Sequence, residues 1–199
     1  MTGRFIVVEG GEGVGKSTQV DVLAARLAAS GAAVDKTREP GGTEEGVALR
    51  HKLLHAGDVT PEDELGWMLE DRRIHVEQRI RPNLENGMVV VCDRFTPSTL
   101  AYQGEARGMG VDDVERRSVA ATGGLEPDVV VVLDLPDEIA ESRVARDRDR
   151  FEREGADFHA AVRRAYRELA PARGWVLLDA SGSVDDVAAR VWAVVEPHL

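Results

Sequence analysis

The stretch Gly10-Gly-Glu-Gly-Val-Gly-Lys-Ser17 decides the fold of this chain, because it satisfies the pattern G-x-x-x-x-G-K-[ST]. Residues 5–9 before it are a short apolar run typical of a buried strand. Residues 17–29 after it carry apolar side chains at helical spacing. Glycines let backbone amides converge on a phosphate chain, and the helix N-terminus adds partial positive charge. The predicted ATP-phosphate-binding residues are Gly10, Gly11, Glu12, Gly13, Val14, Gly15, Lys16, Ser17 and Thr18.

Strands and helices alternate along the rest of the chain. The runs at 88–92 and 128–134 are continuous and rich in valine, a pattern typical of central strands in a parallel sheet that is covered on both faces. Further strands are predicted at 33–37 and 175–179, and further helices at 44–55, 62–84 (with Pro82 near its end) and 184–196. This alternation predicts an α/β protein with the three-layer P-loop NTPase fold, a five-stranded parallel sheet flanked by helices. Without a repeat or linker, residues 1–199 are expected to form a single domain.

Composition excludes several classes of protein. The 199 residues include 25 basic and 36 acidic side chains, for a net charge of −11, which disfavours binding to nucleic acid. No run approaches the roughly 18 apolar residues that a membrane span needs. A single cysteine, Cys92, cannot form an internal disulfide, and we expect a reducing compartment, the cytoplasm. Small phosphorylated substrates remain compatible with this charge if basic side chains gather locally.

Charged residues near the loop have chemistry that suits phosphoryl transfer. Lys16 is expected to reach the β- and γ-phosphates, and the Ser17 hydroxyl to help hold Mg²⁺. Arg94 follows a central strand, at the edge where open α/β sheets bind ligands, and can clamp a phosphate there. Asp93 suits two roles nearly equally, an orienting ligand of Mg²⁺ and a structural cap. Arg38 and Arg94 contribute to the local positive charge that an acidic protein needs.

Three further segments resemble the thymidylate kinase family. They are Thr37-Arg-Glu-Pro-Gly-Gly-Thr43, Cys92-Asp-Arg-Phe-Thr-Pro-Ser-Thr-Leu-Ala-Tyr-Gln-Gly104, and Asp149-Arg-Phe-Glu152 with Phe158 and Tyr166 downstream. Together with the loop they cover nearly the whole chain in the expected order. The resemblance implies an ATP- and Mg²⁺-dependent phosphotransferase that converts dTMP to dTDP and feeds dTTP synthesis. It also implies a nucleoside monophosphate kinase domain, a cytoplasmic homodimer and a lid at about 144–157.

The resemblance also implies which residues bind dTMP. Gln103 would bind the edge of the thymine and Tyr102 would crowd the sugar, favouring deoxyribose. Arg72 matches a phosphate-binding arginine of the family, and Arg50 another arginine near the acceptor. The full set of implied dTMP-binding residues is Glu39, Pro40, Arg50, Met68, Arg72, Arg94, Ser98, Tyr102 and Gln103.

Transition-state charge needs a cation, and the phosphate loop has Glu12 and Val14 where some thymidylate kinases carry a basic residue. The lid is therefore expected to supply it, as in bacterial-type members, and Glu12 resembles the acidic loop residue near the acceptor sugar or the metal. The residues predicted to act in catalysis are Lys16, Arg94, Glu12 and one of Arg146, Arg148 and Arg150.

One position departs from the family pattern and keeps alternatives open. Met68 stands where an aromatic residue usually stacks on thymine, with Trp67 beside it. A methionine sulfur also packs on aromatic faces. A kinase for dUMP, dCMP or a modified pyrimidine nucleotide is therefore the first alternative. A P-loop switch or partitioning ATPase is the second, although the chain has no guanine-binding N-K-x-D.

Overall fold

A computed structural model describes residues 3–143, 150–151 and 153–199. Part of the predicted lid, residues 144–149 and 152, lies outside the described residues, and so do Arg146 and Arg148.

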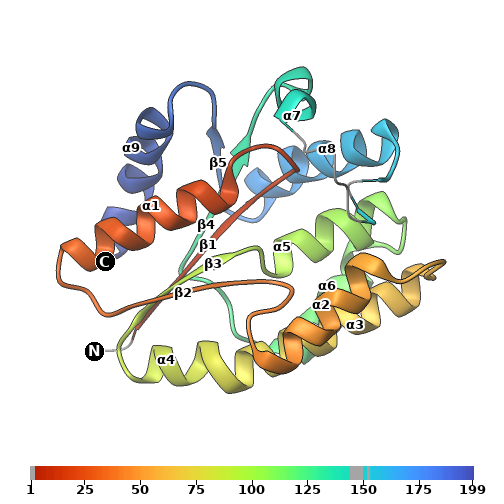
Figure 1. Ribbon diagram of the computed structural model, residues 1–199, viewed down its shortest axis with the longest axis horizontal. Coiled ribbons are helices and arrows are strands. Elements are labelled where there is room, and N and C mark those ends of the chain that lie inside the picture. Colours follow the sequence, from red (N-terminus) through yellow and green to blue (C-terminus); the bar gives the residue numbers. More distant parts are fainter. Residues whose placement is uncertain (1–2, 144–149, 152) are drawn as a thin grey trace.

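The five predicted strands form one sheet, in which every pairing is parallel. They are β1 (Arg4–Gly10), β2 (Val34–Arg38), β3 (Val89–Asp93), β4 (Val129–Asp134) and β5 (Val176–Asp179). Their spatial order is β2-β3-β1-β4-β5, so the strand that leads into the phosphate loop lies at the centre. Figure 1 shows the sheet between two layers of helices. The predicted α/β P-loop NTPase fold is confirmed.

The helices fall close to their predicted ranges. The described ones are α1 (Lys16–Ala29), α2 (Glu44–His55), α3 (Pro61–His75), α4 (Arg81–Glu85), α5 (Thr96–Thr99), α6 (Val111–Thr122), α7 (Asp137–Arg143), α8 (Ala156–Ala172) and α9 (Val184–Val195), with π-helical turns η1 (Val76–Ile80) and η2 (Leu100–Ala106) and the 3-10 turn η3 (Glu196–His198). The helix predicted at 62–84 is thus α3, η1 and α4 in succession. Proline has no N–H for the α-helical ladder, and the residues before Pro82 adopt π-helical hydrogen bonding. No described helix is long and apolar enough to cross a membrane.

Each face of the sheet packs against a different set of helices. Ile6 and Val8 of β1 face a cluster that includes Leu23 and Leu27 of α1 and Val191 of α9. Alternate residues of β1 face the other way, into a cluster built from η1, η2 and α8. Figure 1 shows α1 and α9 together on one side of the sheet. Because both faces are covered, the central strands are apolar throughout, as their sequences indicate.

The carboxyl ends of the strands converge at one edge. β1 ends at Gly10, β2 at Arg38 and β3 at Asp93. Arg38 pairs with Asp93, and Asp93 pairs with Val8, two residues before Gly10. From β1 the chain goes to β2 and β3 on one side and then crosses from β3 to β4 on the other side, so the strand order reverses beside β1. Open α/β sheets bind ligands at such a point.

Leu27 tests the importance of the α1 layer, since its side chain is fully buried between α1 and the sheet. Leu27→Ala leaves a cavity in that layer and is expected to lower the free energy of unfolding by about 2–5 kcal/mol. Val47→Ala on α2, where the side chain is 55% exposed, is the control and should change it by less than about 0.5 kcal/mol. Urea unfolding followed by circular dichroism measures both. Equal effects of the two substitutions would contradict this packing.

Candidate active site

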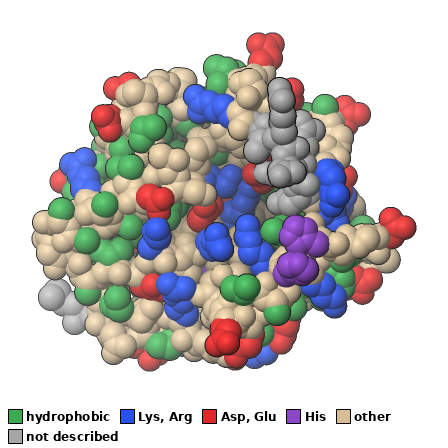
Figure 2. Space-filling view, in the orientation of Figure 1, with side chains coloured by type: hydrophobic (Ala, Val, Ile, Leu, Met, Phe, Trp, Pro, Cys, Tyr) green, Lys and Arg blue, Asp and Glu red, His purple; other side chains and the backbone are tan. Residues whose placement is uncertain are grey.

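A cavity of about 440 Å³ opens at the carboxyl edge of the sheet. Figure 2 shows Lys and Arg side chains gathered around a hollow on this face, so the acidic protein does concentrate positive charge locally. Most residues predicted for the two substrates line the cavity. From the phosphate loop and the metal pair they are Glu12, Gly13, Gly15, Lys16, Ser17, Thr18 and Asp93; from the acceptor set they are Glu39, Pro40, Arg50, Met68, Arg94, Ser98, Tyr102 and Gln103.

The phosphate loop keeps its shape through glycines with positive φ. Gly13 has φ +77°, and a Cβ there would lie 2.2 Å from the carbonyl oxygen of Ala140 in α7, so only glycine fits. Lys16 donates from Nζ to the carbonyl oxygen of Gly11 at 2.6 Å, which holds its side chain along the loop. Burial and the charge of Arg94 lower the pKa of Lys16 from its usual value. Gly10, Gly11 and Val14 belong to the loop but do not line the cavity.

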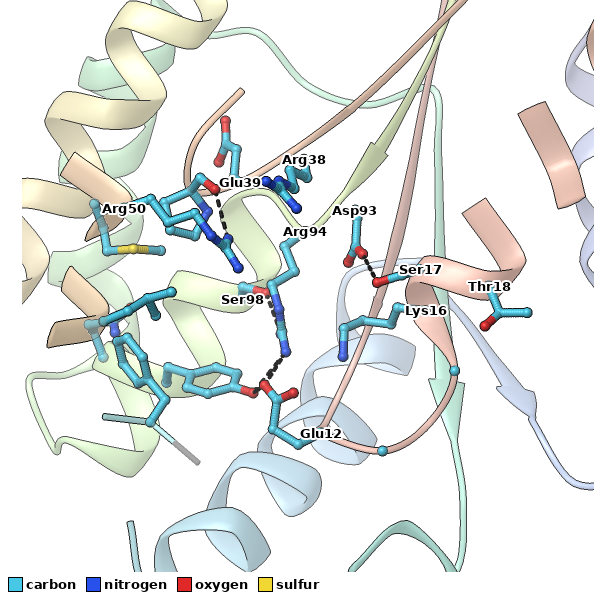
Figure 3. A pocket seen from close by; sticks show the side chains of 18 of the residues that line it. Glu12, Lys16, Ser17, Thr18, Arg38, Glu39, Arg50, Asp93, Arg94 and Ser98 are labelled. Atoms are coloured by element: carbon cyan, nitrogen blue, oxygen red, sulfur yellow. Dashed lines mark hydrogen bonds and ion pairs between the residues drawn. The ribbon is translucent and has the colours of Figure 1, made fainter. Parts of the chain in front are cut away.

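Ser17 and Asp93 come together as the predicted metal pair. The Ser17 hydroxyl donates to Oδ2 of Asp93 at 2.7 Å, and Figure 3 shows this contact on the cavity wall beside Lys16. A hydroxyl and a carboxylate suit Mg²⁺, which usually takes one or two protein oxygens and completes its shell with phosphate and water. The residues present therefore fit Mg²⁺. Within the described residues there is no group of three or more His, Cys, Asp or Glu that could hold a metal ion.

Arg94 occupies a strained backbone conformation at the centre of the cavity. Its φ is +74°, a region that non-glycine residues rarely adopt and that is found mainly at functional positions. The guanidinium donates to the carbonyl oxygen of Gly10 at 3.2 Å and to Oγ of Ser98 at 3.1 Å. It also contacts the Tyr102 hydroxyl at 3.2 Å and forms an ion pair with Glu12. Arg94 thus joins the phosphate loop to the part of the cavity wall formed by the residues predicted to bind the acceptor, here called the acceptor wall (Figure 3).

Glu12 is the charge partner of Arg94. It also accepts a hydrogen bond from the Tyr102 hydroxyl at 2.9 Å. Burial alone would raise the pKa of Glu12, but the charges of Arg94 and Lys16 lower it to about 2. Glu12 is therefore anionic at neutral pH and is paired with Arg94 on the cavity wall.

The buried carboxylate of Glu9 holds the Arg94 segment in place. Its Oε1 accepts from the backbone N–H groups of Phe95, at 2.7 Å, and Ser98, at 3.2 Å. Its Oε2 accepts from the hydroxyls of Ser98 and of Tyr166 in α8, both at 2.7 Å. Burial raises the pKa of Glu9, while Arg94 and these hydrogen bonds oppose the rise. This residue was not predicted from the sequence; the available signal is an acidic residue that ends the apolar run of β1.

A second buried network supports the acceptor wall. Nε of Arg72 donates to Glu39 at 2.8 Å, and Nδ1 of His75 lies 2.9 Å from the same carboxylate. Burial opposes ionisation, but Arg72 and His75 hold the pKa of Glu39 below its usual value. Asp71 accepts from the backbone N–H of Gly41 at 3.0 Å. Burial and the nearby Glu39 charge raise the pKa of Asp71 to about 7.

Two predicted arginines lie away from the cavity wall. Arg72 is fully buried beneath it, stacked 5.1 Å from the Phe95 ring, and its Nη1 and Nη2 have no hydrogen-bond partner in the described part of the chain. Arg150 donates to the Leu53 carbonyl at 2.8 Å and to Glu64 at 2.6 Å, outside the cavity lining. Arg146 and Arg148 lie outside the described residues, so the choice among the three lid arginines stays a prediction.

The cavity wall also includes residues outside the predicted binding set, of which Phe151 and Arg38 belong to the quoted motifs while Leu54 and Arg143 do not. Leu54, Arg143 and Phe151 line the cavity, and the Phe151 ring lies edge-on to Tyr102 at 6.0 Å. Arg38 lines it too. Leu54 and Arg143 belong to helices whose sequence patterns resemble ordinary amphipathic surfaces, so only their position in the fold distinguishes them.

Comparison with known proteins places these features in one family. The family model described as Thymidylate kinase matches residues 8–191. A thymidylate kinase of Synechococcus sp. (strain JA-3-3Ab) is 49% identical over 197 residues, covering 98% of this chain and 96% of the relative. Those of Desulfovibrio desulfuricans and Leifsonia xyli subsp. xyli are 44% and 45% identical; they cover 98% and 95% of this chain, and 96% and 92% of their own lengths.

The raised pKa of Asp71 predicts a pH-dependent effect on stability. The folded protein retains a proton on Asp71 up to about pH 7, whereas the unfolded chain releases it near the ordinary value of 3.8, so this residue makes folding less favourable as pH rises between the two. Asp71→Asn keeps an acceptor for Gly41 and removes the ionisation. We expect Asp71→Asn to be more stable than the natural protein by more than about 1 kcal/mol at pH 8, with a smaller gain at pH 5.

Urea unfolding at the two pH values measures that difference, since the other titrating groups contribute equally to both proteins. Asp63→Asn is the matched control, because Asp63 is an exposed residue at the start of the same helix. A gain that is the same at both pH values would show that the Asp71 pKa is not raised.

Proposed function

The chain belongs to the thymidylate kinase family, and on that premise we propose that it transfers the γ-phosphoryl group of ATP to the 5′-phosphate of dTMP, forming dTDP for dTTP synthesis. One observation carries the proposal beyond family membership. The phosphate loop and the acceptor wall line the same cavity, and Arg94 contacts both, through Gly10 and Glu12 on one side and Ser98 and Tyr102 on the other. A donor and an acceptor phosphate bound there would meet at Arg94.

The proposed mechanism relies on position and charge. The attacking oxygen of a nucleoside monophosphate is already anionic, so no strong general base is required. Lys16 and the loop amides would hold the ATP phosphates, and Ser17 and Asp93 would hold Mg²⁺, which neutralises phosphate charge when bound. Arg94 would exchange Glu12 for the acceptor phosphate and stabilise the charge that develops during transfer. Further positive charge would come from the lid, for which Arg146, Arg148 and Arg150 remain the candidates.

The acceptor side supports a pyrimidine nucleotide. Met68 and Gln103 are buried residues that line the same wall, so an apolar side chain and an amide lie together beside the cavity. The amide can hydrogen-bond to a pyrimidine edge, and the thioether can pack on its face. We propose dTMP as the preferred acceptor, with dUMP or dCMP as the alternative that Met68 permits. The family resemblance supports a cytoplasmic homodimer built from single-domain subunits.

A nucleotide-binding switch is the second class of function that a phosphate loop permits. Here the segment that follows β3 supplies Arg94, Ser98, Tyr102 and Gln103 to the cavity wall. Those side chains suit the binding of an acceptor substrate, which a switch that only senses the γ-phosphate does not need.

The acceptor itself is tested by a panel of nucleoside monophosphates. In a coupled assay of ADP release with ATP and Mg²⁺, dTMP should give the highest kcat/KM, followed by dUMP and then dCMP. Preference for dCMP would contradict the proposed acceptor. Slow ATP hydrolysis that no monophosphate accelerates would instead favour the switch.

Arg94→Ala tests the mechanism. Removing the guanidinium takes away the group that contacts both substrates, and we expect kcat for dTMP to fall by at least about 100-fold. Arg116→Ala is the control, because Arg116 is an exposed arginine of α6 paired only with Asp113 in the described contacts. Its kcat should stay within about twofold of the natural value. Near-normal turnover by Arg94→Ala would refute the assignment.

A further inference from the structure

Glu64 is a buried carboxylate beside the cavity that the proposed mechanism does not use. It lies on α3, one helical turn before Met68, and the exposed fraction of its side chain is 1%. An isolated charge buried to this extent would be costly, so its partners decide what it does. These partners are Gln103 of η2, Arg107 directly after η2, and Arg150 within the predicted lid.

The contacts divide between the two carboxylate oxygens. Oε1 accepts from Nε2 of Gln103 at 2.7 Å and from Nε of Arg107 at 3.3 Å. Oε2 accepts from Nη2 of Arg107 at 3.1 Å and from Nη1 of Arg150 at 2.6 Å. Both oxygens of Glu64 thus accept from guanidinium N–H groups, which have no acceptor to offer in return, so neither oxygen is placed to donate.

This arrangement determines how the Gln103 amide is oriented. Because Glu64 cannot donate, the NH₂ group of Gln103 has to face it, and the amide oxygen takes the other side. That oxygen, Oε1, is buried without a hydrogen-bond partner in the described structure, while Gln103 lines the cavity. A buried acceptor without a partner is unfavourable unless a ligand supplies a donor.

We propose that Glu64 is the positioning residue that sets base specificity, by holding Gln103 so that it offers the base an acceptor and no donor. The inference rests on the proposed function, in which a pyrimidine nucleotide occupies this wall. Thymine and uracil carry a ring N3–H that satisfies such an acceptor, whereas the N3 of cytosine is itself an acceptor and would oppose it. Selection between bases would then depend on a carboxylate behind the amide that contacts them.

The same carboxylate also contacts the predicted lid. Arg150 binds Glu64 and also donates its backbone N–H to the Leu54 carbonyl at 3.1 Å. Arg107 bridges Glu64 to Glu154 at 2.5 Å and stacks over the Phe158 ring at 4.4 Å. Loss of these contacts would affect turnover with every acceptor alike. This common loss of turnover therefore cancels when the kcat/KM values for two acceptors are compared on one enzyme.

Glu64→Gln tests the proposal, because a glutamine at 64 can donate to Gln103 and lets that amide turn its NH₂ toward the base. We expect the ratio of kcat/KM for dTMP to that for dCMP to fall by about tenfold, the size of one hydrogen bond. The ratio for dTMP to dUMP should stay unchanged, since both bases carry N3–H. Glu62→Gln, an exposed glutamate of the same helix paired with Arg117, is the matched control and should change neither ratio.

The double exchange Glu64→Gln with Gln103→Glu keeps the test decisive if the single variant folds poorly. The carboxylate at 103 would accept from the amide at 64 and still offer the base an acceptor, so the preference for dTMP over dCMP should return. A Glu64→Gln enzyme that loses activity equally with all acceptors, or an exchange variant that does not prefer dTMP, would overturn the inference alone. A natural enzyme that prefers dCMP would overturn the proposed function as well.

Discussion

The fully buried carboxylate of Glu9 is the contact on which the active-site geometry depends. It is the last residue but one of the central strand and accepts four hydrogen bonds, from two backbone N–H groups and two hydroxyls. These donors come from the segment after β3 and from α8, so one side chain joins three elements that are distant in sequence. A buried acceptor without partners would be costly, and each partner is therefore held firmly. The strained backbone of Arg94 is maintained by the segment that Glu9 anchors.

The protein is acidic overall but has basic side chains gathered at its cavity. Its net charge of −11 repels phosphates, yet its substrates carry several. Acidic side chains beside the cavity are paired with arginines: Glu12 with Arg94, Glu39 with Arg72, and Glu64 with Arg107 and Arg150. Such pairs hold each guanidinium in a defined place before substrate arrives, which reduces the ordering cost of binding. Of these pairs, Glu12–Arg94 lies on the cavity wall, where phosphate can compete for the arginine.

In the proposed function, recognition of the acceptor would depend on residues behind the cavity wall as much as on the wall itself. Gln103 and Met68 face the space, but Glu64 orients the amide of Gln103 and Arg72 lies fully buried beneath the wall. Buried polar groups with few alternative partners have one favourable arrangement, and that uniqueness is what specificity requires. In the proposed site Met68 would give a softer stacking contact than an aromatic residue, and the polar contacts would then carry more of the discrimination.

The sequence by itself determined the layered fold and the phosphate loop, because both depend on local patterns: valine runs for central strands, and glycines at fixed spacing before a helix. It also identified most residues of the acceptor wall through contiguous motifs. Only the tertiary structure showed that Glu9 and Glu64 are buried organisers, that Arg150 is bound to Glu64, and that Arg72 lies beneath the cavity. The reason is physical: the partners of these side chains lie more than thirty residues away in the chain, and a charged residue's role depends on which of them the fold brings within hydrogen-bond distance.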